Sequence, residues 1–222
     1  MLTSEQIEQI RIKELQMPDA LRRTTDIDYT EGYFFVTLNV HDRLPILGSI
    51  IGRYLPDPKQ VIDAGVRLTA LGEAVMRCWL DIPSFHPQVE LLDAQVMPEH
   101  FHGLLHLKKN GKPSKNRNGK PSQKQQHMGR YINGFMVGCT HAYWDILGID
   151  WHAMTGENKD GYHGAWTDWQ HKASLRGPSL FAPGYNDTTP ITAEEVATKI
   201  AYIRSNPERR IIVGCEDDWW KK

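Results

Sequence analysis

The sequence predicts an α+β domain, in which strands and helices follow one another without a regular alternation. An aromatic and β-branched run, YFFVTLNVH, opens after Gly32 and is typical of a strand. Apolar residues within 68–82 recur at helical spacing and predict a helix. Two further apolar runs, 89–97 and 100–107, flank a turn signal and predict a pair of strands. The first four elements are therefore strand, helix, strand and strand.

Between the first strand and the first helix we expect little regular structure. Residues 44–58 contain three prolines and two glycines, so the sequence predicts a loop with a short extended segment. Further along, 125–147 predicts a long helix with Gly148 as its C-cap. Residues 180–189 predict a short strand followed by a turn.

The last helix carries the clearest start and stop signals. Thr192 and Glu195 have the spacing of a capping box, which places the start of a helix there. Proline lacks the backbone N–H that a helix interior uses, so we expect this helix to end before Pro207. The organisation that follows is an N-terminal arm over 1–28, one domain over 29–213 and a tail over 214–222.

Composition limits the class of protein. The chain has 222 residues and a formal charge of −1, which fits one domain and gives no global signature of a nucleic-acid binder. Its three cysteines are far apart, which argues against a disulfide framework or a zinc knuckle. No signal peptide or membrane span is apparent, so we expect a cytoplasmic protein with no membrane partner.

Local charge and composition differ from the average. Residues 108–124 contain seven lysines or arginines and no acid, which predicts a flexible basic loop that contacts a polyanion or is simply solvated. No Asp or Glu occurs between Glu99 and Asp145. Residues 149–179 are rich in Trp and His and predict an irregular insertion, which either stacks on nucleic-acid bases or folds back on the domain.

The candidate chemistry begins with His100 and His102. Their spacing places both imidazoles on one face of the predicted strand, with Phe101 on the other, as in two-thirds of a divalent-metal site. An isolated pair of this kind is more often a solvated surface feature. Tyr202 and Asn206, four residues apart, share one face of the last predicted helix. If that helix covers the histidines, an Asn206 oxygen completes the site and Tyr202 becomes a nucleophile beside a metal.

These pieces together resemble the REP-associated tyrosine transposases, single-tyrosine members of the HUH (His-hydrophobe-His) endonuclease superfamily that also includes IS200-like transposases. The resemblance covers most of residues 20–213. It rests on motifs in family order: DYxxGYFFVT at 28–37, LGEAVMRCWLDIP, VELLDAQVMPEHFHGLL, PGYND and YIRSNP.

The resemblance implies a ferredoxin-like βαββαβ sandwich with an antiparallel sheet, the HUH motif on a central strand and the nucleophile on a C-terminal helix. It implies His100, His102 and Asn206 as ligands of Mg²⁺ or Mn²⁺, although two imidazoles also accept Zn²⁺. Tyr202 would cut single-stranded or hairpin DNA through a covalent 5′-phosphotyrosine. We expect a monomer or homodimer.

Cationic residues near these motifs are candidates for DNA contacts. They are Arg22, Arg23, Arg43, Lys124, Arg130, Arg204, Arg209 and Arg210. Two alternatives stay open: a domesticated hairpin-binding protein with weak or no catalysis, and a replication-initiator or relaxase-type nicking enzyme. Glu99 and His106 remain ambiguous neighbours, and His106 is placed beyond the metal site by strand rise.

Overall fold

The computed structural model describes residues 28–56, 59–108, 128–149, 179–183 and 186–216. The strands are β1 (Gly32–Asn39), β2 (Gly48–Pro56), β3 (Lys59–Leu68), β4 (Val89–Val96), β5 (His100–Leu107) and β6 (Asn186–Ile191). The helices are the 3₁₀ turn η1 (His41–Arg43), α2 (Ala70–Leu80), α3 (Ile82–Phe85), α4 (Met128–Leu147) and α7 (Ala193–Glu216).

The main sheet has the strand order β4-β5-β1-β6, and every neighbouring pair is antiparallel. Counting only the strands of this sheet and the helices α2 and α4 that connect them, the chain order is β1, α2, β4, β5, α4, β6. That order and strand arrangement define a ferredoxin-like βαββαβ sandwich, so the predicted fold class is confirmed. Strand β5, which carries the two histidines, is central as expected, because it pairs with both β4 and β1.

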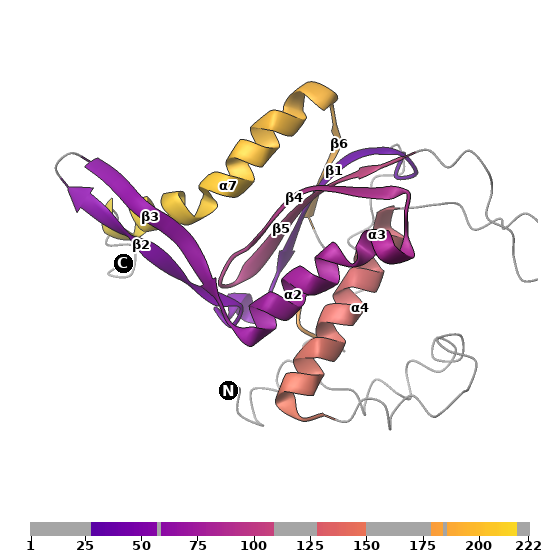
Figure 1. Cartoon of the computed structure of the whole chain (residues 1–222), viewed down its shortest axis with the longest axis horizontal. Coiled ribbons are helices and arrows are strands. Elements are labelled where there is room, and N and C mark those ends of the chain that lie inside the picture. The colour runs from indigo at the N-terminus through magenta and orange to yellow at the C-terminus, as the bar shows by residue number, and fades with distance from the viewer. Residues whose placement is uncertain (1–27, 57–58, 109–127, 150–178, 184–185, 217–222) are drawn as a thin grey trace, which may run out of the picture.

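The two faces of this sheet are covered differently. Helices α2 and α4 lie on one face and α7 lies across the other (Figure 1). Along β5, Phe101 and Leu105 belong to the core under α2 and α4, whereas Leu104 belongs to a smaller core with Ile203 of α7. Side chains alternate along a strand, so His100 and His102 share the α7 face with Leu104. The fold therefore brings the last helix over the histidine pair.

The hairpin of β2 and β3 corrects the prediction of a loop over 44–58. The two strands pair with each other and with no other strand of the described chain, and they extend away from the main sheet (Figure 1). Pro56 lies at the end of β2, next to the turn, where its missing N–H breaks no ladder in the strand interior. Gly52 has a φ of 129° at an irregularity in the register, a conformation that favours glycine. Pro56 therefore marks the end of a strand, and Gly52 marks a bulge.

The prediction that the last helix ends before Pro207 is also wrong, because α7 continues to Glu216. In an uninterrupted helix the N–H of residue 207 would donate to the Ile203 carbonyl, and proline has none. The Asn206 side-chain Nδ2 lies 3.3 Å from that carbonyl and donates to it instead. A side chain therefore replaces the backbone donor that Pro207 removes.

Both predicted helix caps are present. At the start of α7 the Thr192 N–H donates to the Glu195 carboxylate at 2.8 Å, which is one half of a capping box. Gly148 follows α4 with a φ of 71°, and the next N–H, of Ile149, donates to the Trp144 carbonyl, as in a Schellman motif. The predicted strand near 180–189 is β6, displaced to Asn186–Ile191, with Phe181 forming only an isolated bridge to Val40.

Several predictions concern segments outside the described residues. These segments are nearly all of the N-terminal arm, most of the basic loop (109–124), the predicted start of the following helix (125–127), most of the Trp/His-rich insertion (150–178) and the last residues of the tail (217–222). Among the residues that are described, no helix is long and apolar enough to cross a membrane.

Candidate metal and nucleophile site

The two histidines of β5 point their Nε2 atoms at each other. These two nitrogens lie 3.1 Å apart, and the ring centroids are 4.6 Å apart. His102 is only 4% exposed, whereas the His100 side chain lies nearer the edge of the site at 14%. Two imidazole nitrogens therefore converge on one position on the α7 face of the sheet.

The opposite ring nitrogens meet protein oxygens. His102 Nδ1 lies 2.9 Å from the Thr37 hydroxyl on β1. His100 Nδ1 lies 3.4 Å from the Glu99 carboxylate, which is within ion-pair distance, and it makes no hydrogen bond to any described residue. A hydrogen on Nδ1 of each ring leaves both Nε2 lone pairs directed to the shared position. Burial, with a contribution from the neighbouring His100, lowers the pKa of His102 to about 3. His102 is thus neutral at physiological pH, as a metal ligand must be.

The nitrogen spacing fits a shared divalent ion. Two nitrogens each about 2.1 Å from one metal are roughly 3.0–3.4 Å apart at ligand angles of about 90–109°. The observed 3.1 Å falls within that interval. Within the described part of the chain no group of three or more His, Cys, Asp or Glu side chains is placed to hold a metal. An ion at this pair would take its remaining ligands from amide, water or phosphate oxygens.

Asn39 supplies an amide oxygen near the pair. It is the register partner of His100 on β1, and the strand alternation places it on the same face as Thr37. Its Oδ1 atom is buried and has no hydrogen-bond partner among the described residues. A buried oxygen without a donor is costly, at about 1–3 kcal/mol, so a cation or water there would relieve it.

Tyr202 lies against the same cluster from α7. Its ring is 5.7 Å from the His102 ring and 5.9 Å from the Phe35 ring, and Phe35 stacks on His102 at 5.3 Å. The next residue, Ile203, is fully buried and fixes this turn of the helix on the sheet. Tyr202 itself is 37% exposed, so its side chain is partly open to solvent.

Two cations flank these aromatic rings. The Arg209 guanidinium lies 4.9 Å from the centre of the Tyr202 ring, and the Lys199 ammonium lies 5.2 Å from that of Phe35. Both residues are on α7, one on each side of Tyr202 in the sequence. They give the exposed edge of the site positive charge, which suits a phosphate ligand.

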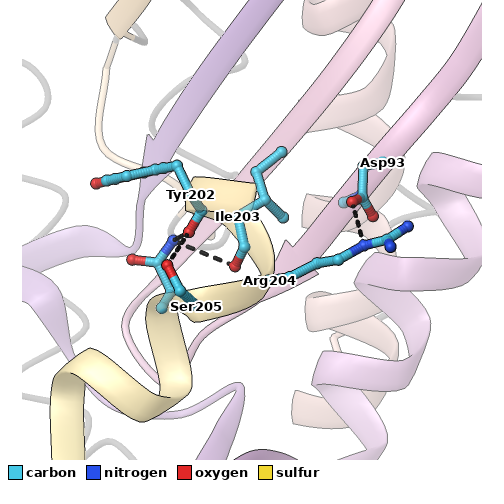
Figure 2. A network of polar contacts seen from close by, with 7 residues as sticks. Asp93, Tyr202, Ile203, Arg204 and Ser205 are labelled. Atoms are coloured by element: carbon cyan, nitrogen blue, oxygen red, sulfur yellow. Dashed lines mark hydrogen bonds and ion pairs between the residues drawn. The ribbon is translucent and has the colours of Figure 1, made fainter. Parts of the chain in front are cut away.

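Asn206 contacts the backbone around the candidate nucleophile. Its Nδ2 donates to the Tyr202 carbonyl at 2.9 Å as well as to that of Ile203. Ser205 Oγ also donates to the Tyr202 carbonyl, at 3.1 Å. Figure 2 shows this group of contacts, with Tyr202 and Arg204 leaving the helix in different directions. The amide nitrogen of Asn206 is therefore engaged in the helix itself.

The candidate DNA-binding arginines are distributed unevenly. Arg204 pairs with Asp93 of β4 at 2.9 Å, and Arg210 pairs with Glu99 at 3.2 Å. Arg43 lies exposed in η1, beyond the end of β1, and Arg130 is exposed on α4, which covers the opposite face of the sheet. Of the described members of the set, Arg209 contacts the Tyr202 ring and Arg210 contacts Glu99, the residue before His100. Arg22, Arg23 and Lys124 lie outside the described residues.

Sequence reasoning missed two residues beside the histidine pair, Thr37 and Asn39, and it left the role of Glu99 ambiguous. The alternation along β1 places Thr37 and Asn39 on one face, but only the register with β5 sets them opposite His102 and His100. His106 is separate from the pair as expected, because it stacks on Tyr33 at 4.3 Å and lies 3.3 Å from a Glu90 oxygen.

Comparison with known proteins gives limited similarity. No family model matches the sequence. The chain is 31% identical over 78 residues to an uncharacterized protein of Haemophilus influenzae, a match that spans 35% of this chain and 37% of that protein. The chain thus covers little more than a third of that relative's length.

Two solved structures are similar to this one. A candidate transposase from Deinococcus radiodurans has a TM-score of 0.39 and 12% identity over 83% of this chain and 97% of its own. A REP-associated tyrosine transposase, solved bound to a REP hairpin, has a TM-score of 0.45 and 15% identity over 87% of this chain and 74% of its own. Both of these solved proteins are described as transposases.

Proposed function

We propose that this protein is a metal-dependent single-stranded DNA endonuclease and strand transferase that uses Tyr202 as its nucleophile. The observation that carries the proposal is the convergence of His100 and His102 at 3.1 Å directly beside the Tyr202 ring. A histidine pair that includes the buried, neutral His102 and a partly exposed tyrosine on the facing helix match the requirements of phosphoryl transfer to tyrosine.

Each residue has a part in the proposed reaction. The Tyr202 hydroxyl attacks a phosphodiester phosphorus, the bond from phosphorus to the 3′ oxygen breaks, and that oxygen takes up a proton to leave a free 3′-hydroxyl. The products are a 5′-phosphotyrosine and a strand end that can attack it in turn and release Tyr202. A divalent ion bound by His100 and His102 would polarise the phosphodiester. Arg209, beside the ring, would hold the phosphate.

Asn206 is the proposed third protein ligand, through its Oδ1 atom. Its Nδ2 already donates to two backbone carbonyls, which holds the amide in one orientation. With the amide fixed through its nitrogen, the Oδ1 atom can coordinate a cation. Mg²⁺ or Mn²⁺ suits a site whose other ligands are oxygens.

The test uses labelled single-stranded DNA that carries a hairpin. Wild-type protein with Mg²⁺ is expected to give a covalent adduct that survives denaturing electrophoresis, and Tyr202→Phe or added EDTA is expected to abolish it. Tyr33→Phe is the matched control, because Tyr33 also lies on this face of the sheet but stacks on His106 instead. That variant should keep the adduct.

Three outcomes would contradict the proposal. An adduct formed by Tyr202→Phe would show that another residue is the nucleophile. An adduct formed in EDTA would show that the reaction needs no divalent metal. Hairpin binding by the wild type with no adduct under any metal would favour the non-catalytic hairpin-binding protein.

A further inference from the structure

We propose that Glu99 is a positioning residue for the metal site, whose carboxylate fixes the His100 ring so that Nε2 faces His102. This inference rests on the proposed function, since it concerns how the proposed metal ligands are oriented.

The carboxylate lies between two nitrogen groups. Glu99 Oε1 is 3.4 Å from His100 Nδ1 and 3.2 Å from an Arg210 guanidinium nitrogen. One oxygen therefore links the ring of a candidate metal ligand to the helix that carries Tyr202. Since Tyr202 and Arg210 are both on α7, the two ends of the candidate site are joined through this residue.

The backbone holds Glu99 in place independently of its side chain. It lies in the turn between β4 and β5, where its carbonyl accepts a hydrogen bond of 3.0 Å from Val40, just after β1. The neighbouring Pro98 carbonyl accepts another from Leu47 at 3.0 Å. A carboxylate on so constrained a turn has little freedom to move away from His100.

Burial makes the contact necessary. Glu99 is only 6% exposed, and a buried carboxylate is unfavourable unless cationic or N–H groups meet it. Among the described residues, the His100 Nδ1 atom and the Arg210 guanidinium are the two nitrogen groups that meet it. A carboxylate that faces Nδ1 favours the ring form that carries hydrogen there. Carboxylate–histidine pairs orient metal ligands in this way in many proteins.

A purely structural role is the competing explanation, and the chain offers a matched control for it. Asp93 on β4 also pairs with an arginine of α7, Arg204, at 2.9 Å. Its side chain is mostly buried, at 15% exposed, compared with 7% for Glu99. The Asp93 pair includes neither histidine. If Glu99 only attaches α7 to the sheet, removing either carboxylate should have the same effect.

The first experiment compares Glu99→Gln with Asp93→Asn in the full chain without DNA. Both variants are expected to lower the melting temperature. Only Glu99→Gln is expected to weaken Mn²⁺ binding, by about 10–100-fold, measured as free Mn²⁺ by electron paramagnetic resonance. Unchanged Mn²⁺ affinity in Glu99→Gln, or an equal loss in Asp93→Asn, would overturn the inference.

The second experiment needs no metal. Nitrogen-15 NMR of the metal-free protein, at a pH where His100 is neutral, is expected to show hydrogen on His100 Nδ1 in the wild type and a mixture of ring forms in Glu99→Ala. Identical ring forms in the two proteins would overturn the positioning role. If the wild type binds no Mn²⁺, the proposed metal dependence fails, and the NMR comparison alone decides the role of Glu99.

Discussion

At the scale of single residues, His100 and His102 lie two positions apart but have different chemical surroundings. His102 is deeply buried between β1 and β4, next to the Thr37 hydroxyl, and its lowered pKa keeps it neutral. His100 lies at the strand end beside an ionised carboxylate. The sequence predicts that both rings share a face, because strand side chains alternate. It cannot predict these surroundings, since Thr37 is 65 residues from His102 and only the strand register joins them.

Gly103 lies on the face of β5 that α2 covers, opposite the face that carries His100 and His102. A Cβ at this position would lie 2.6 Å from the Trp79 ring and 2.9 Å from the Phe101 ring. Trp79 and Phe101 are both buried, so neither ring can withdraw into solvent. The indole of α2 therefore occupies the space above a strand residue that has no side chain.

We expect Gly103→Ala to lower the free energy of unfolding by about 1–3 kcal/mol, because an inserted methyl group must displace a rigid ring. Gly134→Ala in α4 is the matched control. A Cβ there meets nothing within 4 Å, and alanine favours the helix by about 0.5–1 kcal/mol. Urea denaturation of both variants measures the difference. Equal stabilities would show that Trp79 moves freely, contrary to the packing described.

At the scale of elements, α7 shows where a sequence rule fails and why. Proline ordinarily ends or kinks a helix by removing a donor. Here the residue before it, Asn206, supplies a side-chain donor to the affected carbonyl, and Pro207 is itself buried. The sequence Tyr-Ile-Arg-Ser-Asn-Pro contains this side-chain donor. Only the conformation of the Asn206 side chain in the structure shows that it donates to the Ile203 carbonyl.

A double-mutant cycle tests this replacement. Asn206→Ala alone leaves the Ile203 carbonyl without its donor and is expected to destabilise the fold by about 1 kcal/mol. In a Pro207→Ala background the new backbone N–H serves that carbonyl, so the same Asn206→Ala change should cost less. The expected coupling is about 0.5–1 kcal/mol, measured by thermal and urea unfolding. Additive effects would mean that Asn206 does not support the helix past Pro207.

The β2–β3 hairpin is the element that sequence analysis missed most completely. Its glycines and prolines resemble loop signals, yet Gly48 opens β2, Gly52 lies at the bulge and Pro56 ends the strand. The hairpin also supports α7, because the Gly52 backbone approaches Ile211 so closely that a Cβ would lie 2.7 Å from its side chain. The far half of the helix thus packs on an element outside the main sheet, which periodicity within one segment cannot reveal.

At the scale of the whole molecule, the fold class and the residues on each face of the sheet could be predicted from local sequence patterns. The electrostatic potential at the candidate site could not, because it depends on which charged residues the fold brings together. The net charge is −1, but no acid occurs between Glu99 and Asp145, and α7 brings Lys199 and Arg209 to the candidate site. Binding to DNA through such local charge releases counterions, whatever the total charge of the protein.

We therefore expect the affinity for single-stranded DNA to fall linearly with the logarithm of salt concentration, with a slope of about −0.7 for each phosphate contacted. Replacing three lysines of the basic loop should make the slope less steep by up to about 2. The loop variant is Lys112→Gln, Lys115→Gln and Lys120→Gln, and the matched control, with the same change in net charge, is Arg53→Gln, Arg67→Gln and Arg77→Gln.

Fluorescence anisotropy of a labelled oligonucleotide at several salt concentrations measures both slopes. Only the loop variant should change, because long-range attraction between whole molecules is screened over about 8–10 Å at these ionic strengths, while a phosphate in contact is not. An equal change in the two variants would assign the salt dependence to net charge. A wild-type affinity that does not change with salt concentration would show that the basic loop makes no contact with DNA phosphates.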